Sequence, residues 1–421
     1  MIIIITIMNI ILYTSLFILK SRQNSPFMFL YIMIISYVLI PSLLDIPNET
    51  VDYHQFAKPI FLAETTLIKS HIYITMVGTL MLFMELIFRR RSSNNIQKIS
   101  INNKIGIFIY TPILTLFAVI SGYFIIGSAI ANANFESSRS GGLGVASLII
   151  AYLSLFSIPI PALLNLQGRK ILAIVALIPL SIPVIVFGGA RQMLVIAVLS
   201  YVYSFIIKQK KAPEKIFLII IILFPIAEYF LEGIKYIRNL PDLSSRIDAI
   251  ANLEFLESAE FGGGIESSGR FSFYNIVSGI YIQDSFQLNY LLRTILFWLP
   301  SFLDVFSIKP ADFEYNMFYA IMGGRQGTMH PTLFGSIFAD SWLLFPFWIS
   351  FLFLFMKFIE SYLKNNNKYS GYIYFISIYI CIMWARGSLY APILVTFYIF
   401  IIINLHNIYI RMRNTTKKVT V

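Results

Sequence analysis

The amino-acid sequence predicts an all-α fold, a polytopic bundle of about eleven membrane-spanning helices, with ten to twelve as the range. Hydrophobic residues make up 57% of the 421 residues and charged residues only 13%, whereas a soluble domain is roughly half apolar and a quarter charged. The apolar stretches suit helices of about 17 to 25 residues and lack the alternation of a barrel strand. Basic residues also recur at every second loop, as in a chain that crosses a membrane repeatedly.

The apolar stretches that we expect to cross the membrane are separated by polar loops. They lie at 1–19, 27–44, 71–88, 105–126, 144–165, 171–187, 192–207, 216–231, 343–359, 372–385 and 391–409. The first stretch has no basic start and no small-residue cleavage site, so we expect a retained span and not a signal peptide. The single cysteine, Cys381, falls within a span. A disulfide within the chain is therefore impossible, and a cysteine-based metal site is not expected.

The basic loops predict which side of the membrane each loop faces. Their residues are Lys20 and Arg22; Arg89, Arg90, Arg91, Lys98 and Lys104; Arg169 and Lys170; Lys208, Lys210, Lys211 and Lys215; Lys357, Lys364 and Lys368; and Arg411, Arg413, Lys417 and Lys418 in the tail. Because cytoplasmic loops are enriched in Lys and Arg, the N-terminus is predicted to lie outside and the basic tail inside. The net charge of +11 thus indicates topology and contact with anionic membrane lipids, not with nucleic acid.

Three sections follow from this topology. Residues 1–231 carry eight spans with short loops, 232–342 form a large outer loop, and 343–421 carry three spans and the cytoplasmic tail. The outer loop holds most of the Asp and Glu residues, and we expect the site within it. Its aromatic, leucine-rich segment 286–306 is predicted to lie in the outer interface as an amphipathic or re-entrant helix. The alternative, a further crossing, would put the basic tail outside.

The stretch Gly323 to Gly335, GGRQGTMHPTLFG, is the predicted active centre. Gly323 and Gly324 lack the Cβ atoms that keep backbone away from a ligand. Arg325 supplies a planar fork of hydrogen-bond donors, which suits a phosphate or diphosphate. We therefore expect Arg325 to act in catalysis and the two glycines to bind substrate.

His330 is the predicted general base or acid, because an imidazole with an ordinary pKa near 6.5 exchanges protons near neutrality. It precedes Pro331, which suits the first turn of a helix expected to continue through 345–358. Carboxylates are alternative bases, and the sequence does not choose among them: Glu266, Asp312, Glu314 and Asp340.

Three further arginines lie beside glycines and are predicted to bind substrate: Arg191 in GGARQ, Arg270 in SSGRFSF and Arg386 in RGSLYAP. Arg191 and Arg386 come close before helices that descend from the outer face, so positive helix N-termini and guanidinium groups meet in one layer. A single interfacial arginine often only anchors a helix end. The adjacent glycines favour a phosphate cradle. No metal-ligand or nucleotide motif is present, so neither metal nor cofactor is expected.

The segments VFGGARQMLV (Val186 to Val195) and GRQGTMHPTLFGSIFADSW (Gly324 to Trp342), with the many-span layout and the late outer loop, resemble the bacterial oligosaccharide repeat-unit polymerases, the Wzy-type O-antigen polymerases. The resemblance implies a GT-C-like glycosyltransferase of the inner membrane. It would use undecaprenyl-diphosphate-linked oligosaccharide as donor and acceptor at the periplasmic face, with a chain-length regulator protein as a candidate partner. By this resemblance Arg191 and Arg325 match the family's periplasmic arginines, and His330 is similar in role to the histidine of the O-antigen ligases.

Three alternatives stay open, of which a purely structural scaffold would leave the glycine-arginine motifs unexplained. An O-antigen ligase shares the donor and the architecture and differs in its acceptor. A lipid-linked oligosaccharide flippase is a transporter, which should carry charged residues within its spans and often internal repeats. The predicted spans hold little beyond Glu85 and Glu228, which favours the enzyme.

Overall fold

The computed structural model describes most of the chain, with gaps. The described residues are 1–48, 50–51, 60–90, 105–126, 144–187, 192–208, 236–237, 240, 243–254, 267–279, 288–299, 307–310, 313–321, 330–365 and 368–419. The predicted span at 216–231 lies outside this set.

The first half of the chain is helical, as predicted, apart from one short pair of strands. Its elements are α1 (Ile2–Arg22), α2 (Met28–Ile34), the π-helix η1 (Ile35–Leu39), α3 (Ile40–Asn48), β1 (Thr50–Val51), β2 (Ile60–Phe61), α4 (Glu64–Arg90), the 3-10 helix η2 (Gly106–Tyr110), α5 (Thr111–Ile126), α8 (Gly144–Ser157), α9 (Ile160–Leu166), α10 (Lys170–Val175), α11 (Ile178–Phe187) and α12 (Gln192–Lys208). Strands β1 and β2 pair antiparallel, with Thr50 opposite Phe61. The sequence did not predict this pair.

The second half contains the helices of the predicted outer loop and the last spans. They are α14 (Leu243–Ala251), α16 (Ser267–Ser278), α17 (Asn289–Ile295), the 3-10 helix η3 (Leu296–Trp298), α18 (Phe313–Ile321), α19 (Thr332–Ser341), α20 (Phe345–Lys364), α21 (Ser370–Arg386) and α22 (Tyr390–Val419). The prediction of one helix from Pro331 through 345–358 was wrong, because the chain breaks between α19 and α20. Pro346 explains the break, since its ring would clash with the carbonyl of Trp342 in a continuous helix.

Within the described residues, five helices are long and apolar enough to cross a membrane. They cover Ile2–Arg22, Glu64–Phe88, Ile149–Leu166, Phe345–Lys364 and Tyr390–Met412, and shorter apolar helices accompany them. Many of their large apolar side chains are exposed on the bundle surface, such as Ile4, Phe83 and Leu405, where a bilayer would solvate them. The chain is thus a multi-pass helical membrane protein.

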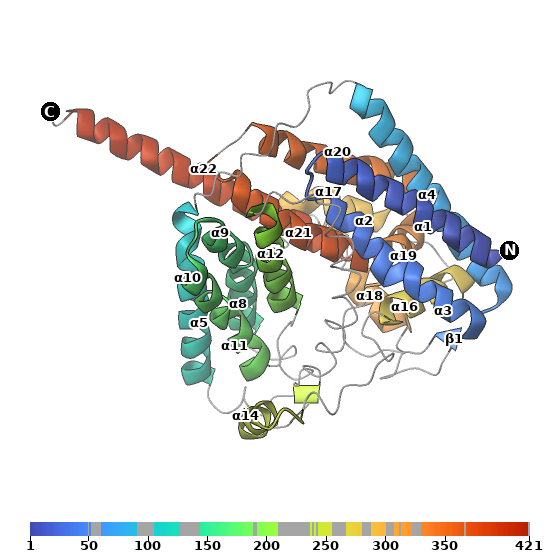
Figure 1. Ribbon diagram of the computed structural model, residues 1–421, viewed down its shortest axis with the longest axis horizontal. Helices are drawn as coiled ribbons and strands as arrows, with labels where there is room; N and C mark the ends of the chain where they lie inside the picture. The colour runs from blue at the N-terminus through green and yellow to red at the C-terminus, as the bar shows by residue number, and fades with distance from the viewer. Residues whose placement is uncertain are drawn as a thin grey trace.

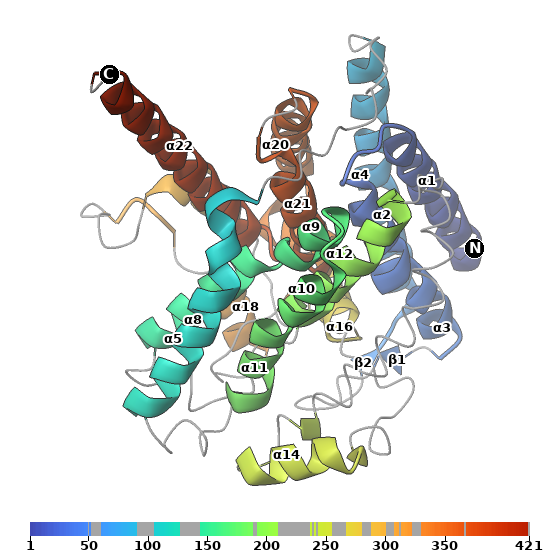
Figure 2. The ribbon, with the colours of Figure 1, turned by 60° about the vertical axis from the view of Figure 1, so that its left-hand side comes forward.

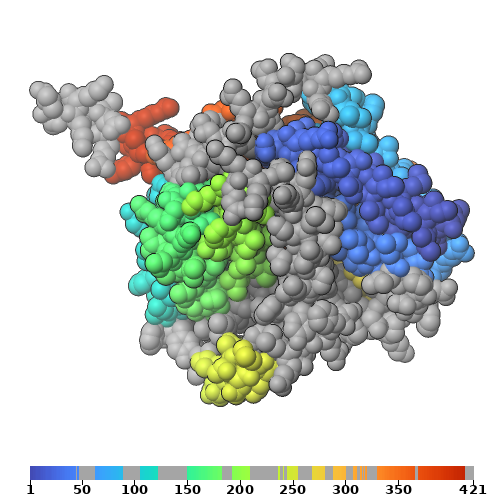
Figure 3. All heavy atoms as spheres, in the orientation of Figure 1, coloured from blue at the N-terminus to red at the C-terminus, as the bar shows by residue number. Residues whose placement is uncertain are grey.

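Helix α21 lies at the centre of the bundle, and its residues from Ser370 to Ala385 are all buried. It contacts α2 on one side and α9 and α12 on another, and it joins α19, α20 and α22. Figure 1 shows α1 and α4 side by side at one end of the molecule and α5, α8, α10 and α11 grouped at the other. The same two groups form opposite parts of the surface in Figure 3.

The two ends of the bundle differ in what they carry. In two views, β1 and α14 lie on the side opposite the C-terminal end of α22 (Figures 1 and 2). In the predicted topology the segments around β1 and α14 face outward and the end of α22 faces the cytoplasm, and this sidedness stays a prediction. In both views α16 and α18 lie nearer to β1 and α14 than to the C-terminal end of α22, and we refer to this side as the outer side.

Four charged residues form a cluster between α1, α4 and α20, in which Lys20, Glu85 and Glu360 are buried and the side chain of Lys357 is 27% exposed. The Nζ atom of Lys20 lies 2.6 Å from Oε1 of Glu360 and also pairs with Glu85. Lys357 reaches the second carboxylate oxygen of both acids, at 3.1 Å each. Lys20 and Lys357 were predicted to lie in cytoplasmic loops, whereas they lie within α1 and α20. Their burial is tolerated because two cations and two anions neutralise one another.

Candidate functional site

The structure describes three of the predicted site residues: His330, Arg270 and Arg386. The other predicted site residues lie outside the described residues; they are Arg191, Gly323, Gly324 and Arg325. Two of the alternative carboxylates, Glu266 and Asp312, also lie outside them. The candidate site is therefore built from His330 and the side chains around it.

His330 pairs with Glu314, one of the four carboxylates between which the sequence did not choose. Nδ1 of His330 lies 3.3 Å from Oε2 of Glu314, and the two side chains are 19% and 16% exposed. Glu314 stands in the first turn of α18, and His330 comes two residues before α19. With Nδ1 facing a carboxylate, Nε2 is the nitrogen that can take a proton from a substrate. The 3.3 Å contact has the distance of an ion pair but not the geometry of a hydrogen bond.

Tyr290 of α17 links this pair to the start of α22. Its hydroxyl donates to Oε1 of Glu314 at 3.1 Å and accepts the backbone N–H of Leu389 at 2.8 Å and of Tyr390 at 3.3 Å. The first amides of a helix have no partner within it, so Tyr290 satisfies two of them. Burial raises the pKa of Tyr290 and the charge of Glu314 adds to this effect. The hydroxyl therefore keeps its proton and stabilises the carboxylate.

Asp340 holds Tyr290 in place and is unsuited to act as a base. Its carboxylate accepts the backbone N–H groups of Tyr290 at 2.9 Å and Leu291 at 3.0 Å, and the indole N–H of Trp348 at 2.8 Å. Asp340 thus caps the N-terminus of α17 from another helix. Its side chain is buried, with its oxygens already bound to three donors.

The backbone beside His330 is strained and tightly packed. Thr332 has φ +67°, a left-handed conformation that is a genuine outlier for a β-branched residue. Gly387, with φ +106°, ends α21 directly against it, since a Cβ atom at this position would lie 2.5 Å from the carbonyl oxygen of Thr332. Ser336 also donates to the carbonyl of Gly387 at 2.6 Å. Arg386 is thereby brought to the segment that carries His330.

Replacing Gly387 with alanine should displace the start of α19 and with it His330. The added methyl group meets backbone atoms, which cannot rotate away, and the left-handed φ adds a strain of about 1–2 kcal/mol. Gly279→Ala is the matched control, because Gly279 also has a positive φ, of +72°, but has open space around it. We expect Gly387→Ala to lower activity well below that of Gly279→Ala at equal protein level. Equal activities of the two variants would show that this close approach does not position His330.

Arg270 is bound to a carboxylate inside the protein. Its Nε lies 2.7 Å from Oδ2 of Asp45 and one Nη lies 3.3 Å from Oδ1, and its other Nη donates to the carbonyl of Tyr37. Tyr37 belongs to η1, a π-helical turn of the kind that often occurs at functional sites. The hydrogen bonds between Arg270 and Asp45 link α16 to α3 on the outer side. Binding of a diphosphate by Arg270 stays a prediction and would require exchange of Asp45.

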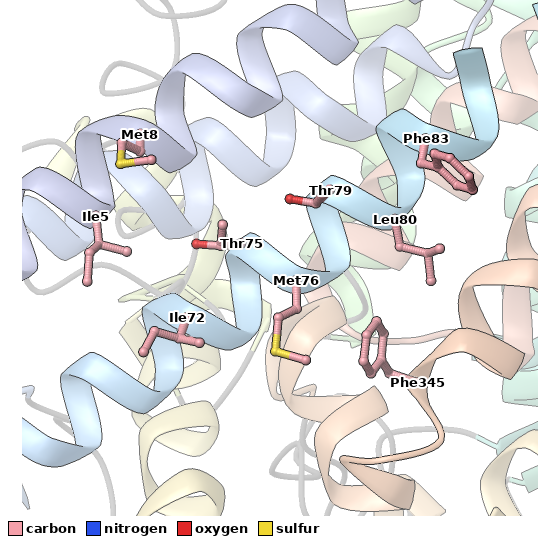
Figure 4. Close-up of a pocket in the computed structure, with 9 residues that line it drawn as sticks. All are labelled: Ile5, Met8, Ile72, Thr75, Met76, Thr79, Leu80, Phe83 and Phe345. Atoms are coloured by element: carbon pink, nitrogen blue, oxygen red, sulfur yellow. The ribbon is translucent and has the colours of Figure 1, made fainter. Parts of the chain in front are cut away.

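Figure 4 shows an apolar groove on the surface between α1, α4 and α20. It has a volume of about 630 Å³ and is lined by Ile5, Met8, Ile72, Thr75, Met76, Thr79, Leu80, Phe83 and Phe345, from α1, α4 and α20. One helical turn separates Phe345 from Trp348, whose ring centre lies 5.3 Å from that of Tyr290. The groove and the site are thus joined through the first turn of α20.

Comparison of the chain with protein-family models, with curated proteins and with solved structures gave no match. Among the described residues, no group of three or more His, Cys, Asp or Glu side chains is arranged to hold a metal ion.

Sequence reasoning did not single out Tyr290. Nothing in its neighbourhood along the chain distinguishes it from the other 24 of the 25 tyrosines, because its partners are 24 and 99 residues away. Glu314 was one of four candidates for the same reason. The role of Asp340 as a helix cap could not be predicted from the sequence either, because Tyr290 of the capped helix α17 lies 50 residues earlier in the chain.

Proposed function

We propose that the protein polymerises undecaprenyl-diphosphate-linked oligosaccharide repeat units into O-antigen or a related surface polysaccharide, at the periplasmic face of the bacterial inner membrane. The observation that carries the proposal is the His330–Glu314 pair on the outer side of a multi-pass membrane protein, supported by the hydroxyl of Tyr290. A histidine oriented by a carboxylate is suited to take a proton from a sugar hydroxyl.

The reaction transfers the growing glycan from its lipid to the incoming unit. A hydroxyl of the acceptor's terminal sugar attacks the anomeric carbon of the donor, and a new C–O bond forms as the bond to the diphosphate breaks. The hydroxyl proton passes to Nε2 of His330, and Glu314 stabilises the resulting imidazolium. Undecaprenyl diphosphate leaves with both electrons of the broken bond.

Negative charge develops on the departing diphosphate, so stabilising it is the second requirement. In the proposal Arg325 and Arg191 bind it, as the sequence predicts, with Gly323 and Gly324 allowing close approach of the backbone. Arg386 joins them from the end of α21. Arginine forks can stabilise a diphosphate in a site with little water and need no metal for it.

The apolar groove supports a lipid-linked substrate. Apart from Thr75 and Thr79, its lining consists of Ile, Met, Leu and Phe side chains, which suits a hydrocarbon chain that gains about 25 cal/mol for each Å² removed from water. A polyprenyl chain held there would keep its diphosphate at the level where α20 begins.

Substituting Arg325 with lysine should be nearly as damaging as substituting it with alanine. Lysine keeps the charge but loses the two parallel donors that match a diphosphate. The readout is the length distribution of surface polysaccharide at matched protein level, with Arg169→Lys, at an exposed position, as the control. Near-normal polymer from Arg325→Lys would show that Arg325 does not bind the diphosphate and only anchors the chain at the membrane.

One observation favours the flippase alternative, namely the buried charges of Lys20, Glu85, Lys357 and Glu360, since ionisable residues inside a bundle often mark transport pathways. The cluster is electrically neutral, however, and lies near the ends of its three helices, as expected for residues that hold α1, α4 and α20 together. The phenotype of a cell without the protein separates the functions. Loss of a polymerase leaves core carrying one repeat, and loss of a ligase leaves polymer on the carrier lipid. Loss of a flippase leaves repeat units inside the cell.

A further inference from the structure

Helix α16 makes contact both with α3, which carries Asp45, and with the segment that carries His330. Toward α3, Arg270 donates to the two carboxylate oxygens of Asp45, at 2.7 and 3.3 Å. Tyr274 follows one turn later on the same face of α16, and its hydroxyl lies 3.1 Å from Oγ of Ser42. Ser42 and Asp45 are also one turn apart in α3, so two polar contacts hold these helices together.

The other contacts of α16 reach the candidate base. Gly269, directly before Arg270, lies so close to this segment that an added Cβ atom would be 3.2 Å from the carbonyl oxygen of His330. Further along, a Cβ atom added to Gly335 of α19 would lie 3.3 Å from Cα of Phe273. The two backbones are thus in close contact, with no long side chain between them to absorb a shift. A displacement of α16 must therefore move the start of α19.

Helix α3 is a firm support for this contact. It continues directly from α2 and η1, and all seven residues of α2 are buried, packed against α1 and the central helix α21. Arg270 also donates to the carbonyl of Tyr37 in η1, at 3.4 Å. The side chains of Arg270 and Asp45 are only 10% and 9% exposed. Water therefore competes little for the hydrogen bonds of this pair, which are strong because both partners are charged.

We propose that Asp45 is a positioning residue for His330, acting through Arg270 and α16. The ion pair fixes α16 on α3, and α16 fixes the segment in which Nδ1 of His330 meets Glu314. The proposal rests on the proposed function, because it takes His330 as the base of the reaction. It gives Arg270 a role different from the predicted binding of a diphosphate, since the guanidinium group stays bound to Asp45 throughout the reaction.

The test compares Asp45→Leu and Arg270→Met with the double variant that combines them. Each single change leaves one buried charge without its partner, whereas the double change replaces the ion pair by apolar side chains of similar size. The first readout is hydrogen–deuterium exchange of the α19 amides in the purified full-length protein, which needs no substrate. We expect faster exchange in both single variants and exchange close to that of the wild type in the double variant.

Two further variants complete the set. Asp45→Asn keeps the shape of the side chain and one acceptor for Arg270, so it takes the place of Asp45→Leu if that variant does not fold, with a smaller increase in exchange expected. Thr115→Val is the matched control. It removes a buried contact of 3.2 Å with Ser157, between α5 and α8 in another part of the bundle (Figure 1), and should leave α19 unchanged.

Kinetics separates positioning from substrate binding. A positioning role predicts a kcat about 100-fold lower in the single variants, the loss expected for a displacement of about 1 Å. The KM for the lipid-linked unit should change little, and kcat should recover in the double variant. A diphosphate ligand predicts a raised KM and no recovery, because the double variant also lacks the guanidinium group.

The proposal is overturned if α19 exchanges in the single variants as it does in the wild type. It is also overturned if the double variant is as inactive as Arg270→Met and both have a raised KM, because Arg270 would then bind the substrate. Failure of the proposed function looks different. In that case the wild type forms no polymer, while the exchange of α19 still changes in the single variants and recovers in the double variant, which supports the link between Asp45 and α19.

Discussion

Replacing His330 with alanine is expected to abolish polymer while leaving the protein folded. Removing a general base of this kind costs about 10²- to 10⁴-fold in rate, and His330 is only partly buried. Cells that produce the variant should carry core with a single repeat and no ladder, because flipping and ligation continue. Glu314→Gln should lower the rate less, since the imidazole is retained but its charged partner is lost.

The matched control for this prediction is His406→Ala. His406 lies in α22 near the predicted cytoplasmic end, where its Nδ1 is 3.4 Å from the hydroxyl of Tyr369, and its loss should leave the ladder intact. A full ladder from His330→Ala at normal protein level would show that His330 is not the base, with Glu314 as the next candidate. Core without any repeat would count against the polymerase itself.

Replacing Lys20 with methionine is expected to destabilise the protein severely. The side chain of Lys20 is 0% exposed, and its removal leaves Glu85 and Glu360 buried with one cation, Lys357, between them. Breaking a buried pair in this way costs about 3–5 kcal/mol. The readout is folded yield and thermal unfolding in detergent, with the exposed Lys170→Met as the control.

A second substitution tests whether the lost stability can be restored. Lys20→Met combined with Glu360→Gln leaves one cation and one anion, Lys357 and Glu85, and should recover part of the lost stability. If Lys20→Met is as stable as the wild type but loses activity, the cluster does not hold the helices together. That result would favour the flippase alternative.

Most of the helical framework could be predicted because the bilayer imposes a length on each apolar stretch. The predicted stretch 372–385, for example, corresponds to α21. Helix ends were less predictable. The predicted first stretch ends at residue 19, whereas the helix continues to Arg22, since Glu85 and Glu360 neutralise Lys20 from other helices. Such compensation depends on tertiary contacts and leaves no local pattern.

The candidate site was predictable only where its signal is local. His330 stood out because it lies in a polar, glycine-rich stretch before a helix. Its partner Glu314 could not be distinguished from Asp340, because both are carboxylates on the same predicted side. What separates them is that Asp340 caps α17, whereas Glu314 faces the imidazole. The break between α19 and α20 does carry a local signal, because Pro346 stands in the first turn of α20.

The central claim is that this protein alone joins lipid-linked repeat units, and reconstitution tests it most directly. Purified protein would be given undecaprenyl-diphosphate-linked repeat units as the only glycan, in a buffer containing EDTA, and the products separated by length. We predict a ladder of oligomers that stay on the lipid diphosphate, formed by the wild type and by Gly279→Ala, and lost in His330→Ala. Unextended repeat units after incubation with a folded wild-type protein, or a ladder that appears only when magnesium or manganese is restored, would contradict the account.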